Sequence, residues 1–271
     1  MQVIAFFNNR IGTGTTTLVY HLSWMFAEMG QTVLAADLDP QSTLSRMLLD
    51  DEELEHIGPH GWLSADSGAA AIGTNLYLQW GNIELSDFDE VGIKPANAIR
   101  QAIDVAAARR EADLVLVDLG PNLGALNRSA LIAADHVVVP LAPDFHSLQA
   151  LRILGPRLRN WRNEGQHPQP VGFVLLQPSA RSSQQHWIAN IPTAYHEATG
   201  EDPHCLANLR FYRGLMPMAQ QARKPMFRLK PADGAFGANA LAVLDCHAEF
   251  KSLAQAILDA INQNQKPGPA V

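Results

Sequence analysis

The glycine-bearing segment 10–17 holds the residues with the clearest chemical potential in this chain. It follows the apolar run 3–7 and precedes an apolar, helix-like stretch. A strand, a tight glycine turn and a helix in that order form a phosphate cradle, because backbone N–H groups and the positive end of the helix dipole converge on one place. A phosphate loop of the form GxxxxGK(S/T) places Lys directly after its last glycine, where this chain has Thr15. The sequence therefore predicts a phosphate site that lacks its usual cation.

Two further segments place acids after apolar runs. Asp37 and Asp39 follow the run 32–37, and Asp118 ends the run 112–118, with Gly120 close behind. In open α/β sheets, ligands bind outside the carboxyl ends of the strands. We therefore expect the loops 8–16, 37–41 and 118–124 to lie together. A capped turn before a helix is the alternative interpretation of Asp37 and Asp39, since Asp and Pro both favour that position.

The elements that must position these loops alternate along the chain. Strand-like runs are apolar on both faces, which is typical of a parallel sheet covered by helices on both sides. The pattern predicts an α/β fold with a single domain over residues 1–262 and a flexible tail over 263–271. It predicts an acidic surface run at 50–55 and a loop at 57–74. The expected strands are 2–7, 32–37, 75–80, 112–118, 136–141, 171–176 and 206–209, and the expected helices are 16–29, 42–49, 94–111, 127–134, 147–161, 184–198, 216–223 and 239–262.

Composition excludes several classes of protein. A length of 271 residues and 47% hydrophobic content suit one large domain with a substantial core. The net charge of −7 argues against a wholly basic nucleic-acid binder, though not against a local basic patch. Cys205, Cys246 and the ten histidines show no metal-ligand spacing. No apolar run reaches the length of a membrane span, and the N-terminus enters a strand at once, so we expect a cytoplasmic protein without a signal peptide.

Three segments in this order carry a family resemblance: FFNNRIGTGTTTLVYHL, VLAADLDPQSTLS and ADLVLVDLGPNLGALNRSALIAADHVVVPLAPDFHSLQAL. Together they resemble the ParA/MinD superfamily of P-loop ATPases, and the ParA partition branch most closely. The resemblance implies a single-domain P-loop NTPase fold and ATP or ADP with Mg²⁺ as cofactors. It also implies a cytoplasmic role in plasmid or chromosome partition or positioning. Nonspecific DNA and a ParB-like protein or cargo adaptor would be its partners.

Three positions depart from the family's phosphate loop, KGGxGKT(T/S). Thr15 replaces the phosphate-contacting Lys, whose charged hydrogen bond is worth roughly 1.5–3 kcal/mol and whose loss typically costs on the order of 10²–10³ in rate. Arg10 replaces the signature Lys that reaches across a dimer to the partner's nucleotide, and its planar head makes the exchange non-conservative. Ile11 replaces a glycine at the close approach of two subunits, so we expect it to obstruct the nucleotide-sandwich homodimer. The aligned nucleotide-binding residues are Arg10, Ile11, Gly12, Thr13, Gly14, Thr15, Thr16 and Thr17.

The remaining site residues match the family pattern. Thr16 matches the hydroxyl that ligates Mg²⁺, and Asp118 matches the carboxylate that holds the metal. Asp39 matches the catalytic carboxylate that positions the attacking water. Gly120 would offer its N–H to the terminal phosphate. These matches leave the site with several carboxylates and fewer cations, so without Mg²⁺ it should repel a triphosphate.

Basic residues gather late in the chain, where relatives contact DNA. The stretch 210–230 contains no acid, and Phe211, Tyr212 and Phe227 are interleaved with its basic residues. The resemblance implies salt-sensitive phosphate contacts with DNA or an acidic partner. A solvated basic face, or contacts with local carbonyls and carboxylates, is the alternative. The six residues are Arg210, Arg213, Arg223, Lys224, Arg228 and Lys230; a second cluster on one predicted helix comprises Arg152, Arg159 and Arg162.

The last predicted helix resembles MinD in position but not in charge. MinD relatives end in a basic amphipathic membrane helix. Here the helix carries Glu249 and Asp259 with only Lys251, so we expect it to pack on the sheet and predict no membrane partner.

Three functions remain open from the sequence. The leading interpretation is a ParA-like partition, positioning or regulatory protein with a degenerate ATP site and weak or absent hydrolysis. The second is a slow ATPase in which Arg10 supplies the missing charge. The third is an interaction scaffold that binds no nucleotide.

Overall fold

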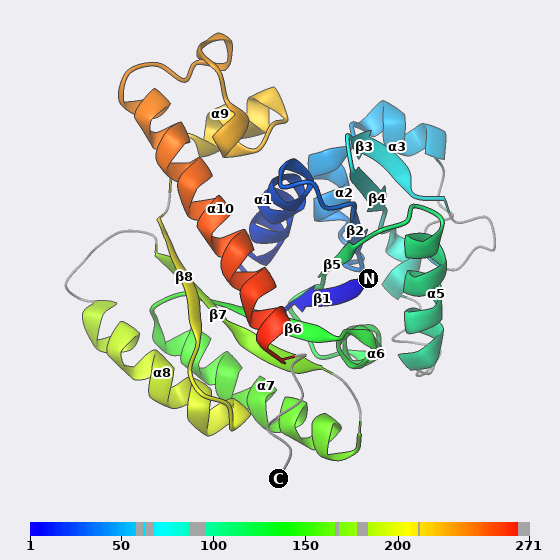
Figure 1. The fold of residues 1–271 in the computed structure, drawn as a ribbon, viewed down its shortest axis with the longest axis vertical. Coiled ribbons are helices and arrows are strands. Elements are labelled where there is room, and N and C mark those ends of the chain that lie inside the picture. The colour runs from blue at the N-terminus through cyan, green and yellow to red at the C-terminus, as the bar shows by residue number, and fades with distance from the viewer. Residues whose placement is uncertain are drawn as a thin grey trace.

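The computed structural model describes residues 1–57, 62, 68–86, 96–165, 168–177, 184–210 and 212–264. Its strands form one sheet in the order β3-β4-β2-β5-β1-β6-β7-β8 (Figure 1). Neighbouring strands pair in parallel, except the antiparallel pair β3 and β4 at one edge. The predicted α/β fold with a mostly parallel sheet is confirmed. The strands are β1 (Gln2–Phe6), β2 (Val33–Asp37), β3 (Ala70–Gly73), β4 (Leu76–Gln79), β5 (Leu114–Asp118), β6 (His136–Leu141), β7 (Gln169–Gln177) and β8 (Cys205–Arg210).

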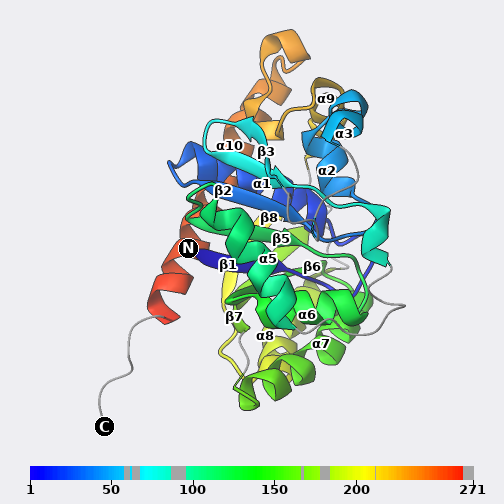
Figure 2. The same ribbon diagram turned by 90° about the vertical axis from the view of Figure 1, so that its right-hand side faces the viewer.

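Helices cover both faces of this sheet, because successive side chains of a strand point to opposite faces. Ile4 and Phe6 of β1 enter a core with α1, α9 and α10, whereas Val3 and Ala5 enter a second core with α5, α6, α7 and α8. Figure 1 shows α10 crossing one face of the sheet, and Figure 2 shows α5 and α6 on the near side of the strands. The helices are α1 (Thr15–Glu28), α2 (Thr43–Leu48), α3 (Asp51–Ile57), α5 (Ala96–Ala108), α6 (Ala125–Ala133), α7 (Phe145–Asn163), α8 (Gln185–Thr199), α9 (Met216–Ala222) and α10 (Ala238–Asn264), with short 3₁₀ turns η1 (Ile83–Ser86), η3 (Met226–Arg228) and η4 (Pro231–Asp233).

Helix α10 packs on the sheet, as its charge pattern predicted. Its apolar stripe, which includes Phe250, Leu253, Ile257 and Ile261, is buried in the same core as α1. Within the described ranges, no helix is both long and apolar enough to cross a membrane.

The structure corrects one predicted feature, the loop 57–74, and shows that another, the exposed acidic run, is helical. The expected loop 57–74 contains β3, which joins β4 through a tight turn where Asn75 has φ 60°. A four-residue edge strand has no long apolar run to reveal it, and Asn is one of the few residues that tolerates a left-handed backbone. The acidic surface run forms α3, because Asp50 and Glu53 cap its start reciprocally: each side chain accepts a hydrogen bond from the other's N–H at 2.8 Å.

Several element ends also differ from the prediction by a few residues. Helix α7 begins at Phe145, two residues before the predicted start, because Asp144 caps it by accepting from the Ser147 N–H. Helix α10 continues to Asn264, two residues beyond the predicted end of that helix at 262. The rest of the predicted tail and the predicted helix start at Lys94 lie outside the described residues.

Candidate functional site

The phosphate loop between β1 and α1 adopts a conformation that needs its glycines. Gly12 and Gly14 have φ values of 78° and 79°, in the left-handed region that glycine enters without strain. Gly14 caps α1 without any side-chain hydrogen bond to the first turn. The first N–H groups of α1 are therefore left for a ligand, as in an anion-binding helix start.

Thr15, at the position of the family's lysine, is tied into the loop itself. Its hydroxyl lies 3.0 Å from the Thr13 hydroxyl, and Thr13 in turn donates toward the Arg10 carbonyl at 3.4 Å. Thr13 is buried. The position that should carry a cation thus contributes a short neutral side chain with an internal partner.

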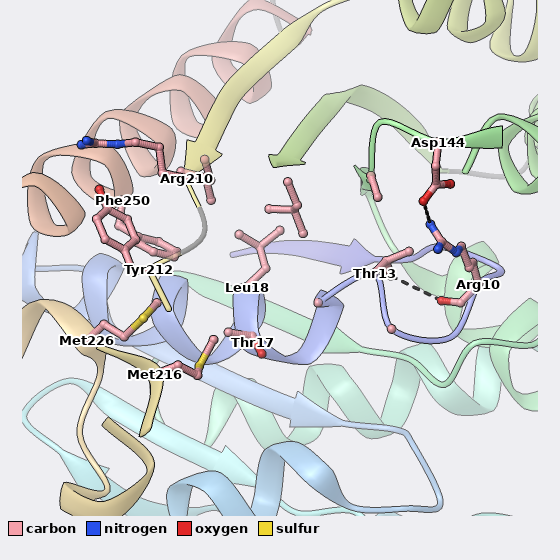
Figure 3. Close-up of a pocket in the computed structure, with 15 residues that line it drawn as sticks. Arg10, Thr13, Thr17, Leu18, Asp144, Arg210, Tyr212, Met216, Met226 and Phe250 are labelled. Atoms are coloured by element: carbon pink, nitrogen blue, oxygen red, sulfur yellow. Dashed lines mark hydrogen bonds and ion pairs between the residues drawn. The ribbon is translucent and has the colours of Figure 1, made fainter. Parts of the chain in front are cut away.

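Arg10 is held by the start of α7. Its guanidinium donates to the Asp144 carboxylate at 2.5 Å and to the Ser147 hydroxyl at 3.1 Å (Figure 3). Ser147 also accepts a hydrogen bond from the Ala142 N–H. The neighbouring Ile11 is 82% exposed. Sequence reasoning missed Asp144 and Ser147, although the helix-cap pattern of Asp144 with a hydroxyl residue three positions later was visible.

A cavity of about 300 Å³ opens beside the loop. Gly12, Thr13 and Gly14 line its polar end, and Thr17 and Leu18 of α1 continue the wall (Figure 3). Its other end is apolar, and the Arg210 guanidinium at its edge is paired with Asp245 and Glu249. A polar phosphate end joined to an apolar end is the shape that a nucleotide with a flat base requires. The apolar residues of the lining are Leu176, Leu209, Tyr212, Met216, Met226 and Phe250, and Leu176 lies beside Gly14.

Acids stand at the ends of β2 and β5, on the other side of the helix start. Asp37 and Asp118 are paired neighbours in the sheet, and both are fully buried. Asp37 accepts hydrogen bonds from the Ser45 N–H at 2.8 Å and the Ser45 hydroxyl at 2.7 Å, as the capped-turn interpretation predicts. Burial raises the Asp37 pKa to about 6, although the bonds from Ser45 oppose the shift. Asp39 also caps its turn, by accepting from the Gln41 N–H.

Asp118 is the unpartnered group of the site. Among the described residues, neither of its carboxylate oxygens has a hydrogen bond of ordinary geometry. Burial, then the charge of Asp37, raise its pKa well above the usual range, while the Thr16 side chain and the Leu119 N–H act against this shift. A buried carboxylate without a partner beside a hydroxyl suits a hard cation such as Mg²⁺, which keeps several waters and phosphate oxygens as ligands. Thr16 and Asp118 therefore fit the metal role expected of them.

The structure brings Gly120 close to Asp39. A Cβ at Gly120 would lie 3.3 Å from Asp39 Oδ1, so the loop after β5 and the turn after β2 are in contact. Asn127 of α6 fixes this loop by donating to the carbonyls of Gly120 and Asn122 at 2.7 and 2.8 Å. The three loops predicted to meet at the carboxyl edge of the sheet do so. Asn127 was not foreseen, although the carbonyls that it bonds lie only seven and five residues before it.

The basic stretch is largely engaged in local contacts. Arg228 pairs with Glu28 of α1 at 3.1 Å and lies 4.6 Å from the Trp24 ring centroid. Lys224 pairs with Asp233 at 2.7 Å, and Arg223 donates to the carbonyls of Arg46 and Leu49 at the end of α2. With Arg210 held by acids of α10, at least four of the six basic residues contact carbonyls or carboxylates of the fold, which is the kind of contact that the alternative interpretation named. Arg213 and Lys230 are exposed, and Phe211 lies outside the described residues.

The sequence and fold of this chain are similar to those of several known proteins. The family described as "AAA domain" matches residues 1–167. Protein IncC of Escherichia coli is 29% identical over 190 residues, covering 67% of this chain and 52% of IncC. The chromosome partitioning protein ParA of Caulobacter vibrioides is 27% identical over 198 residues, covering 70% of this chain and 74% of that protein. The chain thus spans about half the length of the first of these relatives. A variant of Cyanothece McdA in complex with ATP has a similar fold, with a TM-score of 0.71 and 14% identity over 95% of this chain and 96% of McdA.

Proposed function

The chain belongs to the ParA/MinD family of P-loop ATPases, which includes partition and positioning proteins, and from this premise we propose that it acts as such a factor with a degenerate nucleotide site. In this proposal it binds ATP or ADP with Mg²⁺ but hydrolyses ATP weakly or not at all. It would perform partition, positioning or regulation through DNA or a protein partner.

The observation that carries this proposal is the side chain at position 15. Catalysis of phosphoryl transfer depends on positioning and on fixed positive charge at the phosphates. Thr15 supplies no charge, and its hydroxyl is engaged by Thr13. The two cations that line the cavity in the described part of the chain, Arg10 and Arg210, are both ion-paired. Losing a transition-state contact of this kind typically costs on the order of 10²–10³ in rate.

The remaining residues support nucleotide binding. The left-handed turn at Gly12 and Gly14 presents the first N–H groups of α1 to phosphate. The apolar end of the cavity can hold the base. Thr16 and Asp118 would hold Mg²⁺, which would supply positive charge to the phosphates when bound. Asp39, beside Gly120, would orient water near the terminal phosphate.

A titration of ATP–Mg²⁺ into the purified chain and into Thr15→Lys, with phosphate release followed in both, tests the proposal. We expect the unmodified chain to bind nucleotide and to release phosphate at least about 10²-fold more slowly than Thr15→Lys. Measurable turnover by the unmodified chain at a rate near that of Thr15→Lys would overturn the proposal.

A slow ATPase is the second candidate function. Retention of Thr16, Asp39 and Asp118 favours it, and so does the position of Arg10 on the cavity wall. For Arg10 to replace lysine it would have to leave Asp144. The third candidate, an interaction scaffold without nucleotide, would be supported if neither the unmodified chain nor Thr15→Lys bound ATP.

The basic stretch is the surface that the proposal assigns to a partner. It retains exposed Lys230 for nonspecific DNA or an acidic partner, whereas Lys224 and Arg228 are ion-paired within the fold. Retention of the chain on DNA at increasing salt tests whether this stretch binds DNA, because contacts with phosphate weaken steeply as salt rises. The exposed Ile11 supports the expectation that a nucleotide-sandwich homodimer is obstructed.

A further inference from the structure

The helix start of α1 separates an apolar cavity from a group of acids. Thr17 and Leu18 line the cavity, whereas Thr16 interacts with Asp118 on the opposite side. A nucleotide whose base fills the cavity must therefore extend its phosphates across the first turn of α1, from Thr17 toward Thr16. Each added phosphate brings negative charge closer to the ends of β2 and β5.

The acids at that far end have no ion-pair partner among the described residues. Asp37 and Asp118 are fully buried and Asp39 is buried beside them, and in that part of the chain neither Asp118 oxygen has a hydrogen bond of ordinary geometry. Thr15 is neutral, and the Arg10 guanidinium faces Asp144. Like charges in a buried site repel strongly, because the surroundings screen them much less than water does.

We infer that this site selects nucleotides by phosphate number and ranks ADP above ATP when no divalent cation is present. The inference rests on the proposed function in one respect, that the cradle binds adenine nucleotide. The apolar end and the first turn of α1 serve both nucleotides equally, so the discrimination comes from the third phosphate meeting the acids. A cation held by Thr16 and Asp118 would offset that repulsion, so the difference between the affinities for ADP and ATP should decrease when Mg²⁺ is supplied.

The test is calorimetric titration of the full chain with ADP and with ATP, first in EDTA and then with Mg²⁺. In EDTA we expect the Kd for ATP to exceed that for ADP by about tenfold or more, and the gap to shrink with Mg²⁺. Thr15→Lys should improve ATP binding more than ADP binding and remove the ranking. Leu241→Lys adds the same charge at an exposed position of α10, outside the phosphate loop, and should leave the ranking unchanged.

Asp39→Asn provides a second variant that does not depend on a long side chain fitting the loop. Asn keeps an oxygen to accept from the Gln41 N–H, while one negative charge is removed, so ATP binding alone should improve. Equal affinities for ADP and ATP in EDTA would overturn the inference, as would an effect of Leu241→Lys equal to that of Thr15→Lys. Fast phosphate release by the unmodified chain would instead overturn the proposed function and leave the ranking in EDTA standing. Failure of the unmodified chain to bind either nucleotide would overturn both.

Discussion

The guanidinium of Arg10 donates to the carboxylate of Asp144 at 2.5 Å, although the two residues are 134 positions apart. This pair joins the phosphate loop to the first residue before α7. The carboxylate also caps α7 through the Ser147 N–H, so one acid holds both the loop and the helix. In this arrangement the Arg10 guanidinium forms an ion pair within the chain and stabilises the contact between the phosphate loop and α7.

Asp144→Asn should separate these two roles. Asn caps helices about as well as Asp, so only the ion pair is lost, and we expect the free energy of unfolding to fall by about 0.2–1 kcal/mol. Asp144→Ala should lower the free energy of unfolding by about 1 kcal/mol more than Asp144→Asn, because the helix cap is lost as well. Urea unfolding measures both. We also expect no rise in phosphate release from Asp144→Asn; a clear rise would mean that freed Arg10 can replace lysine.

The sequence predicted the central strands well because they are buried on both faces. Apolar residues dominate the predicted ranges 2–7, 112–118 and 136–141, and β1, β5 and β6 begin and end within two residues of these ranges. Strand β3 was missed because its alternate residues face solvent and it has four residues. The hydrophobic pattern therefore predicted the strands that carry the site but did not predict the edge strand β3.

The site was predictable where its signal is local. The glycine spacing located the phosphate loop, and strand-end acids located the opposite wall. The partners of the basic stretch were not predictable, since Glu28, Asp245 and Glu249 lie outside it in sequence and reach it only through folding. The absence of acids within the stretch 210–230 therefore led to an overestimate of the unpaired positive charge on its surface.

Buried His21 should make the chain less stable in mild acid. Its Nε2 accepts from the Met226 N–H at 3.1 Å, its Nδ1 bonds the Thr17 carbonyl at 2.7 Å, and its ring stacks on Phe250. Burial lowers its pKa to about 4, while the bond to Thr17 opposes the shift. The unfolded chain binds a proton near pH 6.5 and the native chain does not, so stability falls as pH drops from about 6.5 to about 4, by up to about 1.4 kcal/mol per pH unit.

Urea unfolding between pH 7.5 and 4.5 checks this prediction. His21→Gln removes the titrating ring, so its stability relative to the unmodified chain should improve as pH falls, whatever its stability at pH 7.5. His56→Gln is the control, because His56 is exposed on α3. A pH dependence of His21→Gln parallel to that of the unmodified chain would contradict the assignment.

Gly155 sets the spacing between α7 and α8. A Cβ at this position would lie 2.4 Å from the backbone carbonyl of Ala198, which cannot move as a flexible side chain could. Gly155→Ala should therefore lower the free energy of unfolding by about 3 kcal/mol, as overpacked cores do. Asn160→Ala, at an exposed position of the same helix, should change it by less than about 0.5 kcal/mol. Similar unfolding midpoints for the two variants would show that α7 shifts freely.

Arg228 and Lys230 should behave differently, although both belong to the basic stretch. Arg228 bridges η3 to α1 through Glu28 and the Trp24 ring. Its carboxylate partner is about one third exposed, so the ion pair contributes modestly, and the cation–π contact adds about 0.5–1 kcal/mol. Lys230 is exposed at the start of η4. We expect Arg228→Ala to lower the free energy of unfolding by about 1 kcal/mol, and Lys230→Ala to leave it within about 0.5 kcal/mol.

DNA retention at low salt then distinguishes structural from surface charge. A phosphate-contacting lysine contributes about one to the slope of log affinity against log salt, so Lys230→Ala should reduce that slope by about one. Arg228→Ala should leave the slope unchanged, because its guanidinium is committed to Glu28 and Trp24 within the fold. If instead Arg228→Ala lowers the slope and leaves stability intact, its contacts with α1 do not hold in solution, and the basic stretch is a polyanion surface throughout.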